Sequence, residues 1–142
     1  MKVTFCSLFV IVIGYTCLAQ DRYIQVTTGG GVAGTATRHK MSLDGKVLKG
    51  KGLGEIKYTE TGKLKKRTVK KYFKKSKALV ESYPDFNHPG NVYFSILVYD
   101  RGKEIQMTWG DMEHQVPERA ENLYKKINSS LMRLKFIPET HK

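Results

Sequence analysis

The stretch NVYFSILVYDRGKEIQMTWGD, residues 91–111, contains two strand patterns joined by a turn. Residues 92–99 carry apolar or aromatic side chains on both faces, as in a central strand that is covered on both sides. Residues 104–109 alternate between apolar and polar side chains, which is typical of a strand with one face against a core. Because residues 100–102 supply a turn, the two strands are predicted to form an antiparallel hairpin.

A second hairpin is predicted on the N-terminal side of this one. Residues 22–28 alternate as in a strand, and residues 35–43 are rich in β-branched and alternating side chains. The strongest short hairpin signal in the chain follows at Asp44-Gly45. Residues 46–49 are therefore predicted to return as a strand paired with residues 35–43.

A short ribbon and a helix are predicted next. The ribbon is expected from strands at residues 55–59 and 64–66, which turn around Thr61-Gly62. Thr68 is the predicted N-cap of the helix, because a threonine hydroxyl can accept a hydrogen bond from the first turn. Apolar and small side chains then recur at helical spacing, namely Val69, Tyr72, Phe73, Ser76, Leu79 and Val80.

A second helix is predicted after Pro117, a residue that suits the first helical turn. Its apolar stripe consists of Ala120, Leu123, Tyr124, Ile127, Leu131 and Leu134. The predicted fold is therefore α+β, with a mostly antiparallel sheet of four to six strands covered on one face by two amphipathic helices. Residues 20–135 are assigned to this single domain, and residues 136–142 to a loose C-terminal tail.

Residues 1–19 have the pattern of a secretory signal peptide. Lys2 is followed by an apolar run at residues 3–13, and a cleavage site is predicted after Ala19. Because that run is shorter than the roughly 20 residues that span a bilayer, no transmembrane segment is expected after cleavage. The protein is expected to be exported, either to the periplasm or to the medium. A lipid anchor at Cys17 is the alternative, which the three residues before this cysteine disfavour.

Both cysteines, Cys6 and Cys17, lie inside the predicted signal peptide. The mature chain would then contain none, which excludes disulfides, cysteine hydrolases and cysteine-ligated zinc sites. The predicted domain must therefore rely on its hydrophobic core for stability. An origin in bacteria agrees better with a cysteine-free exported chain than an origin in animals does.

Positive charge is concentrated in one part of the chain. The net charge is +12, and residues 38–77 contain 15 Lys and Arg against 3 Asp and Glu. The predicted electrostatic face is the outer side of the first helix, Lys70, Lys71, Lys74, Lys75 and Lys77. Such a face is expected to attract an acidic protein or an anionic envelope surface, or to serve only solubility. Nucleic acid is disfavoured as a partner, because the stretch lacks interleaved exposed aromatic residues.

The segment TTGGGVAGT, residues 27–35, has the glycine spacing of a dinucleotide-binding fingerprint. That fingerprint requires a helix directly after its last glycine, whereas Thr35 begins a predicted strand. No cofactor is therefore expected. The glycines are interpreted as a β-connection that allows close backbone approach, and the possible partner-contact loop consists of Gly29, Gly30, Gly31, Val32 and Gly34.

No catalytic or metal site is predicted. No serine has a nucleophile-elbow motif, and the histidines have no helical metal-ligand spacing. Asp111, Glu113 and His114 could hold a metal as a loop triplet, although such loop clusters are usually solvated. Asp85 with His88 is a weaker alternative. The protein is accordingly predicted not to be an enzyme.

Three short stretches resemble the emfourins, small bacterial inhibitors of thermolysin-like metallopeptidases. They are Gly30–Gly34 after the first strand, Tyr83–Phe86 after the first helix, and Thr108–Asp111 before the proline-led second helix. Val32 occupies the position of a phenylalanine in the family's glycine motif. The resemblance implies an α+β inhibitor that blocks a peptidase with its surface loops and has no catalysis of its own.

Two functions follow from these features. The first is an exported, non-catalytic binding protein, a metallopeptidase inhibitor of the emfourin type. The second is a secreted or envelope structural or interaction module with a basic face and no inhibitory activity. The glycine loop favours the first function, and the concentration of lysines is compatible with both.

Overall fold

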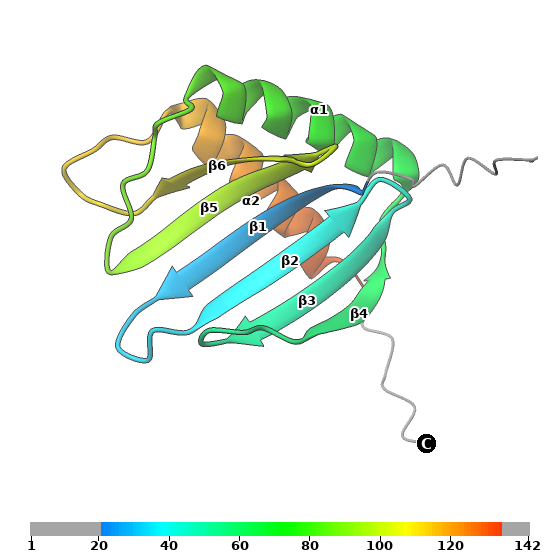
Figure 1. The fold of residues 1–142 in the computed structure, drawn as a ribbon, viewed down its shortest axis with the longest axis horizontal. Coiled ribbons are helices and arrows are strands. Elements are labelled where there is room, and N and C mark those ends of the chain that lie inside the picture. Colours follow the sequence, from blue (N-terminus) through cyan, green and yellow to red (C-terminus); the bar gives the residue numbers. More distant parts are fainter. Residues whose placement is uncertain (1–20, 135–142) are drawn as a thin grey trace, which may run out of the picture.

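The computed structural model describes residues 21–134, which form one six-stranded sheet and two helices (Figure 1). The elements are β1 (Arg22–Gly30), β2 (Ala36–Ser42), β3 (Lys46–Gly52), β4 (Tyr58–Lys63), α1 (Lys66–Ser82), β5 (Val92–Asp100), β6 (Lys103–Trp109) and α2 (Glu118–Met132). The strand order is β4-β3-β2-β1-β5-β6, and every neighbouring pair is antiparallel. The predicted α+β class is confirmed. The predicted signal peptide, 1–19, and tail, 136–142, lie outside the described residues.

Both helices pack on the same face of the sheet; in Figure 1, α2 is seen behind the strands and α1 runs along the top of the sheet. The sheet contributes alternate buried residues to this core, among them Ile24, Val26, Met41, Val47, Ile96, Val98, Met107 and Trp109. The predicted stripe of α1 is buried at every position, and in α2 the stripe is buried from Ala120 to Leu131. Burial of one such side chain contributes about 1.5–3 kcal/mol, so this single core carries most of the stability.

Two local predictions are wrong. The expected ribbon turn at Thr61-Gly62 lies inside β4, where the partner of Val47 is Gly62 and the partner of Leu48 is Glu60. The extra residue makes a β-bulge, and Gly62 (φ 150°) serves that bulge rather than a turn. Thr68 is not the N-cap, because α1 already begins at Lys66 without a side-chain cap.

The two ends of the sheet differ in their connections. At one end, called the tight end, the short turns 43–45 and 101–102 join neighbouring strands. The predicted hairpin turn at Gly45 is present there. Gly45 has a φ of 98°, and its N–H donates a hydrogen bond to the Ser42 carbonyl at 2.9 Å. At the opposite end, called the loop end, lie the longer segments 31–35, 53–57, 83–91 and 110–117 (Figure 1, left).

Candidate functional site at the loop end of the sheet

The glycine segment forms the connection between β1 and β2 at the loop end. Gly30 and Gly31 both have positive φ, 96° and 76°. The Gly30 N–H donates to the Thr35 carbonyl at 3.1 Å, and the Gly31 N–H donates to the Asn91 carbonyl at 2.8 Å. The loop is thus held both across its own base and to Asn91, the residue just before β5, so its backbone is fixed at two points.

The five predicted loop residues have two different roles. A Cβ atom on Gly29 would overlap the Tyr93 ring, and one on Gly30 would overlap the Asn91 carbonyl oxygen, so these two glycines serve packing. Gly31 faces open space, and Val32 beside it is fully exposed. The chain then enters β2 at Ala36, whereas a dinucleotide-binding fold requires a helix at this point.

Three exposed apolar residues lie on this loop or on the segments at its two sides, and we call Val32, Leu53 and Val92 the apolar rim. Leu53 is 66% exposed and Val92 is 46% exposed. Leu53 lies in van der Waals reach of Gly34, and Val92 pairs with Gly30 across the sheet. Grouped exposed apolar residues mark interaction sites more often than scattered ones do. The rim is therefore a candidate contact surface.

Leu53 and Val92 were not predicted as site residues. Leu53 stands alone between Gly52 and Gly54, which is a detectable signal for an exposed apolar residue on a tight loop. Its proximity to Gly34, however, depends on the alignment of β3 with β2. That alignment is a property of the sheet and is not encoded near either residue.

The face of the sheet away from the helices carries a shallow polar hollow of about 320 Å³. Tyr23 stacks on Tyr99 with 4.9 Å between ring centroids, and the Lys40 ammonium lies 3.8 Å from the Tyr23 ring centroid. Burial, followed by the charge of Glu104, raises the pKa of the Tyr23 hydroxyl. This face therefore offers stacked aromatic rings and polar groups near the tight end, a combination that the sequence analysis did not identify.

The predicted electrostatic face lies on α1. Lys70, Lys71, Lys74 and Lys75 are exposed, whereas Lys77 is half-buried because its ammonium pairs with Asp100 at 2.6 Å. Lys77 therefore belongs to an ion-pair network and differs from the four exposed lysines. Of the five predicted residues, those four belong to the exposed basic surface of the helix, to which Lys66 and Arg67 also contribute.

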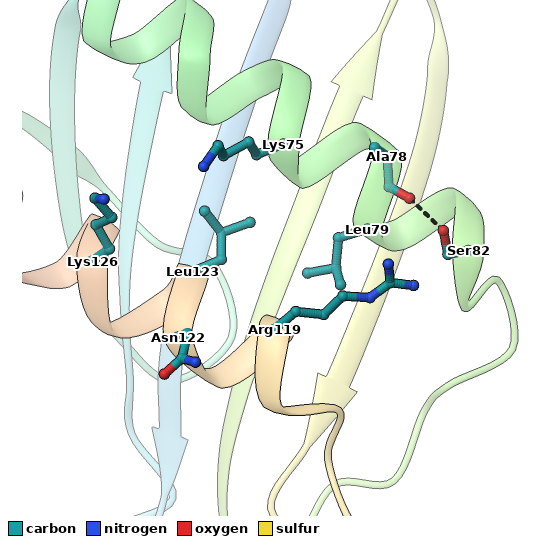
Figure 2. A pocket seen from close by; sticks show the side chains of 8 residues that line it. All are labelled: Lys75, Ala78, Leu79, Ser82, Arg119, Asn122, Leu123 and Lys126. Atoms are coloured by element: carbon teal, nitrogen blue, oxygen red, sulfur yellow. Dashed lines mark hydrogen bonds between the residues drawn. The ribbon is translucent and has the colours of Figure 1, made fainter.

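A groove of about 520 Å³ separates α1 from α2 beside these lysines (Figure 2). Leu79 and Leu123 form its apolar floor, and its cationic walls are formed by Lys75, Arg119 and Lys126. An apolar floor between cationic groups suits an anionic partner with some apolar surface. The basic surface therefore extends from α1 across the groove to α2.

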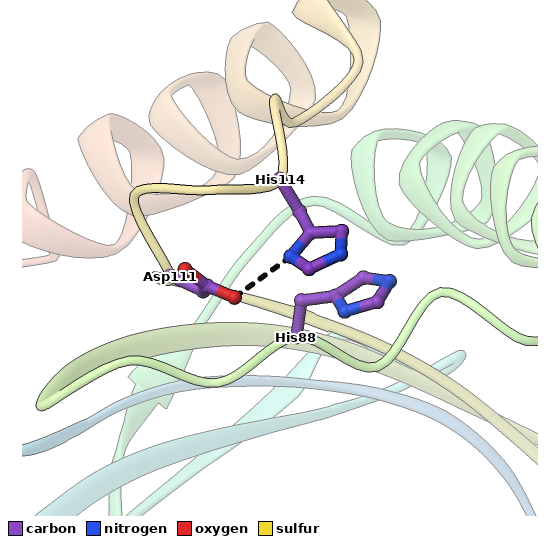
Figure 3. Close-up of side chains that lie close together, drawn as sticks. All are labelled: His88, Asp111 and His114. Atoms are coloured by element: carbon purple, nitrogen blue, oxygen red, sulfur yellow. Dashed lines mark hydrogen bonds and ion pairs between the residues drawn. The ribbon is translucent and has the colours of Figure 1, made fainter.

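The segments 83–91 and 110–117 bring together three side chains that could bind a cation. These are His88, Asp111 and His114, whose possible ligand atoms all lie within 4.8 Å of one another (Figure 3). Of the predicted loop triplet, Glu113 contributes its backbone N–H, which donates to the Asp111 carboxylate at 2.7 Å. This hydrogen bond, followed by the one to His114, lowers the pKa of the Asp111 carboxyl. Asp85, the weaker predicted partner of His88, is outside the cluster.

Comparison with known proteins gives no assignment. No family model matches the chain, and none of the curated proteins matches it. The resemblance to the emfourins thus stays a prediction from three short stretches. Within residues 21–134, neither helix combines the length and the apolar character that a bilayer crossing needs.

Proposed function

We propose that this protein is an exported, non-catalytic binding protein that contacts a protein partner with the loop end of its sheet. The observation that carries the proposal is the apolar rim, in which fully exposed Val32 lies on a loop whose backbone is hydrogen-bonded to Asn91, just before β5. An exposed valine gains free energy when a partner buries it. Its fixed backbone also reduces the entropy lost on binding, so this loop is preorganised to contact a partner.

We further propose that the partner is a thermolysin-like metallopeptidase, as the resemblance to the emfourins implies. Gly31 supports this part of the proposal, because it has no side chain and faces open space next to Val32. Such a loop lets a partner approach the backbone closely while it receives one apolar side chain. The exposed lysines of α1 would steer an acidic partner toward the protein, an effect that weakens as salt is added.

An inhibition assay tests the proposal directly. The wild-type protein is expected to inhibit a thermolysin-like peptidase at concentrations of about 1–10 µM or lower. The Val32→Asp variant is expected to raise the inhibition constant at least tenfold, because the charge cannot enter an apolar pocket. The matched control is Met132→Asp, which changes an exposed apolar residue at the far end of α2. Absence of inhibition by the wild type, or equal effects of both variants, would contradict the proposal.

The second candidate function is an envelope or secreted interaction module that uses its basic surface. It is favoured by the groove between α1 and α2, which has three cationic residues around two leucines. Here the partner is an anionic envelope surface, and binding depends on charge rather than on the apolar rim. A pull-down from the envelope of the source organism separates the two functions. Capture that is lost in Lys75→Glu but retained in Val32→Asp would support the module, and the reverse pattern would support the inhibitor.

A further inference from the structure

The cluster of His88, Asp111 and His114 joins two loops that are far apart in the sequence (Figure 3). The two imidazole rings are stacked, with 3.7 Å between centroids and 7° between planes. The His114 Nδ1 atom lies 2.7 Å from the Asp111 carboxylate. His88 and Asp111 are half-buried, whereas the side chain of His114 is 46% exposed.

Backbone hydrogen bonds fix the positions from which these side chains project. The His88 N–H donates to the Thr108 carbonyl at 3.0 Å, and the Asp111 N–H donates to the His88 carbonyl at 3.1 Å. The two loops approach so closely that a Cβ atom on Gly90 would overlap the backbone of Gly110. The cluster therefore rests on a preformed scaffold and does not depend on side-chain contacts alone.

The ring of Phe86 further restricts His88. It packs edge-on against the imidazole, with 4.9 Å between centroids and 84° between planes. The His114 ring stacks on the same imidazole. His88 thus contacts two rings, whereas the more exposed side chain of His114 has more room to turn.

We propose that His88, Asp111 and His114 form a binding site for a divalent transition metal of the Zn²⁺ class. Two imidazole nitrogens and one carboxylate are a preferred donor set for this ion. With metal–nitrogen bonds of about 2.0–2.1 Å, two ligand atoms of a tetrahedral ion lie roughly 3.3 Å apart. The possible ligand atoms of the three side chains all lie within 4.8 Å of one another, and the His114 Nδ1 atom is 2.7 Å from the Asp111 carboxylate, so small shifts bring them to this separation.

Binding requires one local movement. The lone pairs of parallel stacked rings do not converge on one point, so the His114 ring must turn toward the ion. On binding, the ion replaces any proton shared between His114 Nδ1 and Asp111, and that proton passes to solvent. Three protein ligands leave a fourth position for water or for a group of a partner. The ion would also link segments 83–91 and 110–117 at the loop end.

Titration of the purified, tag-free protein with ZnCl₂ tests this proposal. Calorimetry is expected to show one zinc ion per chain, and thermal unfolding is expected to shift upward as zinc is added. Single variants His88→Gln, His114→Gln and Asp111→Asn are each expected to weaken zinc binding at least tenfold. Fluorescence of Trp109, the single tryptophan of the chain, shows whether each variant is folded. His114→Gln is the most informative change, because its exposed side chain contributes little to the core.

Two matched controls complete the design. Glu113→Gln changes the neighbouring acidic residue of the same loop, and His39→Gln changes a histidine on β2 outside the cluster. Both are expected to bind zinc as the wild type does. The proposal is overturned if the wild type fails to bind zinc at about 100 µM, which corresponds to a binding free energy of roughly 5.5 kcal/mol. It is also overturned if Glu113→Gln abolishes binding while His88→Gln does not.

Discussion

At the tight end of the sheet, short turns join the strands and charged groups are paired, whereas at the loop end the connections are long and apolar groups face solvent. Asp100 at the tight end accepts hydrogen bonds from Arg22 at 2.8 Å and from Lys77 at 2.6 Å. The loop end carries Val32, Leu53, Val92 and also Met112 as exposed apolar residues. The charged groups of Arg22, Lys77 and Asp100 are thus paired within the chain at the tight end. At the loop end, the exposed apolar side chains would be buried only by a partner.

The loop end is nevertheless supported by tightly packed core residues. Trp109 is packed between Phe94 and Tyr124, with centroid separations of 6.2 Å and 5.4 Å. The Tyr124 hydroxyl donates to the Thr27 carbonyl, which ties α2 to β1 just before the glycine loop. The apolar side chains at this end are therefore exposed although the strands and the helix that carry them are well packed. This combination of rigid support and exposed apolar groups is what a docking surface needs.

The largest expected effect comes from Gly30→Ala in the glycine loop. The added methyl group would overlap the Asn91 carbonyl, and the residue would also have to keep a φ of 96°. We expect a loss of about 3 kcal/mol from the free energy of unfolding. Urea titration followed by Trp109 fluorescence measures this loss.

Gly31→Ala is the matched control for that change. Gly31 also has a positive φ, of 76°, but a methyl group there would meet no atom of the described residues within 4 Å. Its expected loss is about 1 kcal/mol, which is the backbone contribution alone. Equal losses in the two variants would show that the contact with Asn91 does not anchor the loop.

An intermediate effect is expected from Asp100→Asn at the tight end. Hydrogen bonds from Lys77, together with the charge of Arg22, lower the pKa of the Asp100 carboxyl. Because the folded-state pKa is the lower one, the ion pairs stabilise the fold above the unfolded-state pKa of about 3.9 and are lost as the pH falls below it. At pH 7 we expect the variant to lose about 1 kcal/mol or less, since both cations are partly exposed.

The pH dependence of this variant provides the test. Unfolding free energies of wild type and Asp100→Asn are compared at about pH 7 and at about pH 2.5, which lies below the unfolded-state pKa of the carboxyl. The difference between the proteins is expected to shrink at the lower pH. A constant difference at both values would assign the effect to packing instead of to charge.

Most of the fold was predictable, because strand alternation and helical spacing are local properties of the sequence. Residues 104–109 show their two-residue period within a few positions and form β6 as expected. The apolar run at residues 92–99 forms β5 as expected, but the helices cover only one of its faces and not both. The bulge in β4 was not predictable, because Gly62 alone is also compatible with a turn and the register against Val47 decides between them.

The candidate sites were only partly predictable for the same physical reason. The sequence indicated the glycine loop, and it placed Asp111 and His114 on one loop. The approach of His88 to them depends on an isolated parallel bridge between Asn87 and Thr108, two residues that are distant in the chain. No pattern around His88 specifies this pairing, so the side-chain cluster emerged only with the three-dimensional fold.

The smallest expected effect on stability comes from Val32→Ala at the loop end, and Val47→Ala near the tight end is its counterpart. Val32 is fully exposed, so its change is expected to alter the unfolding free energy by at most about 0.5 kcal/mol. Val47 is completely buried, and its loss is expected to cost about 2 kcal/mol. Both values are measured by the same urea titration. A large loss at Val32 would mean that its side chain packs within the chain, and the apolar rim would then no longer be free to contact a partner.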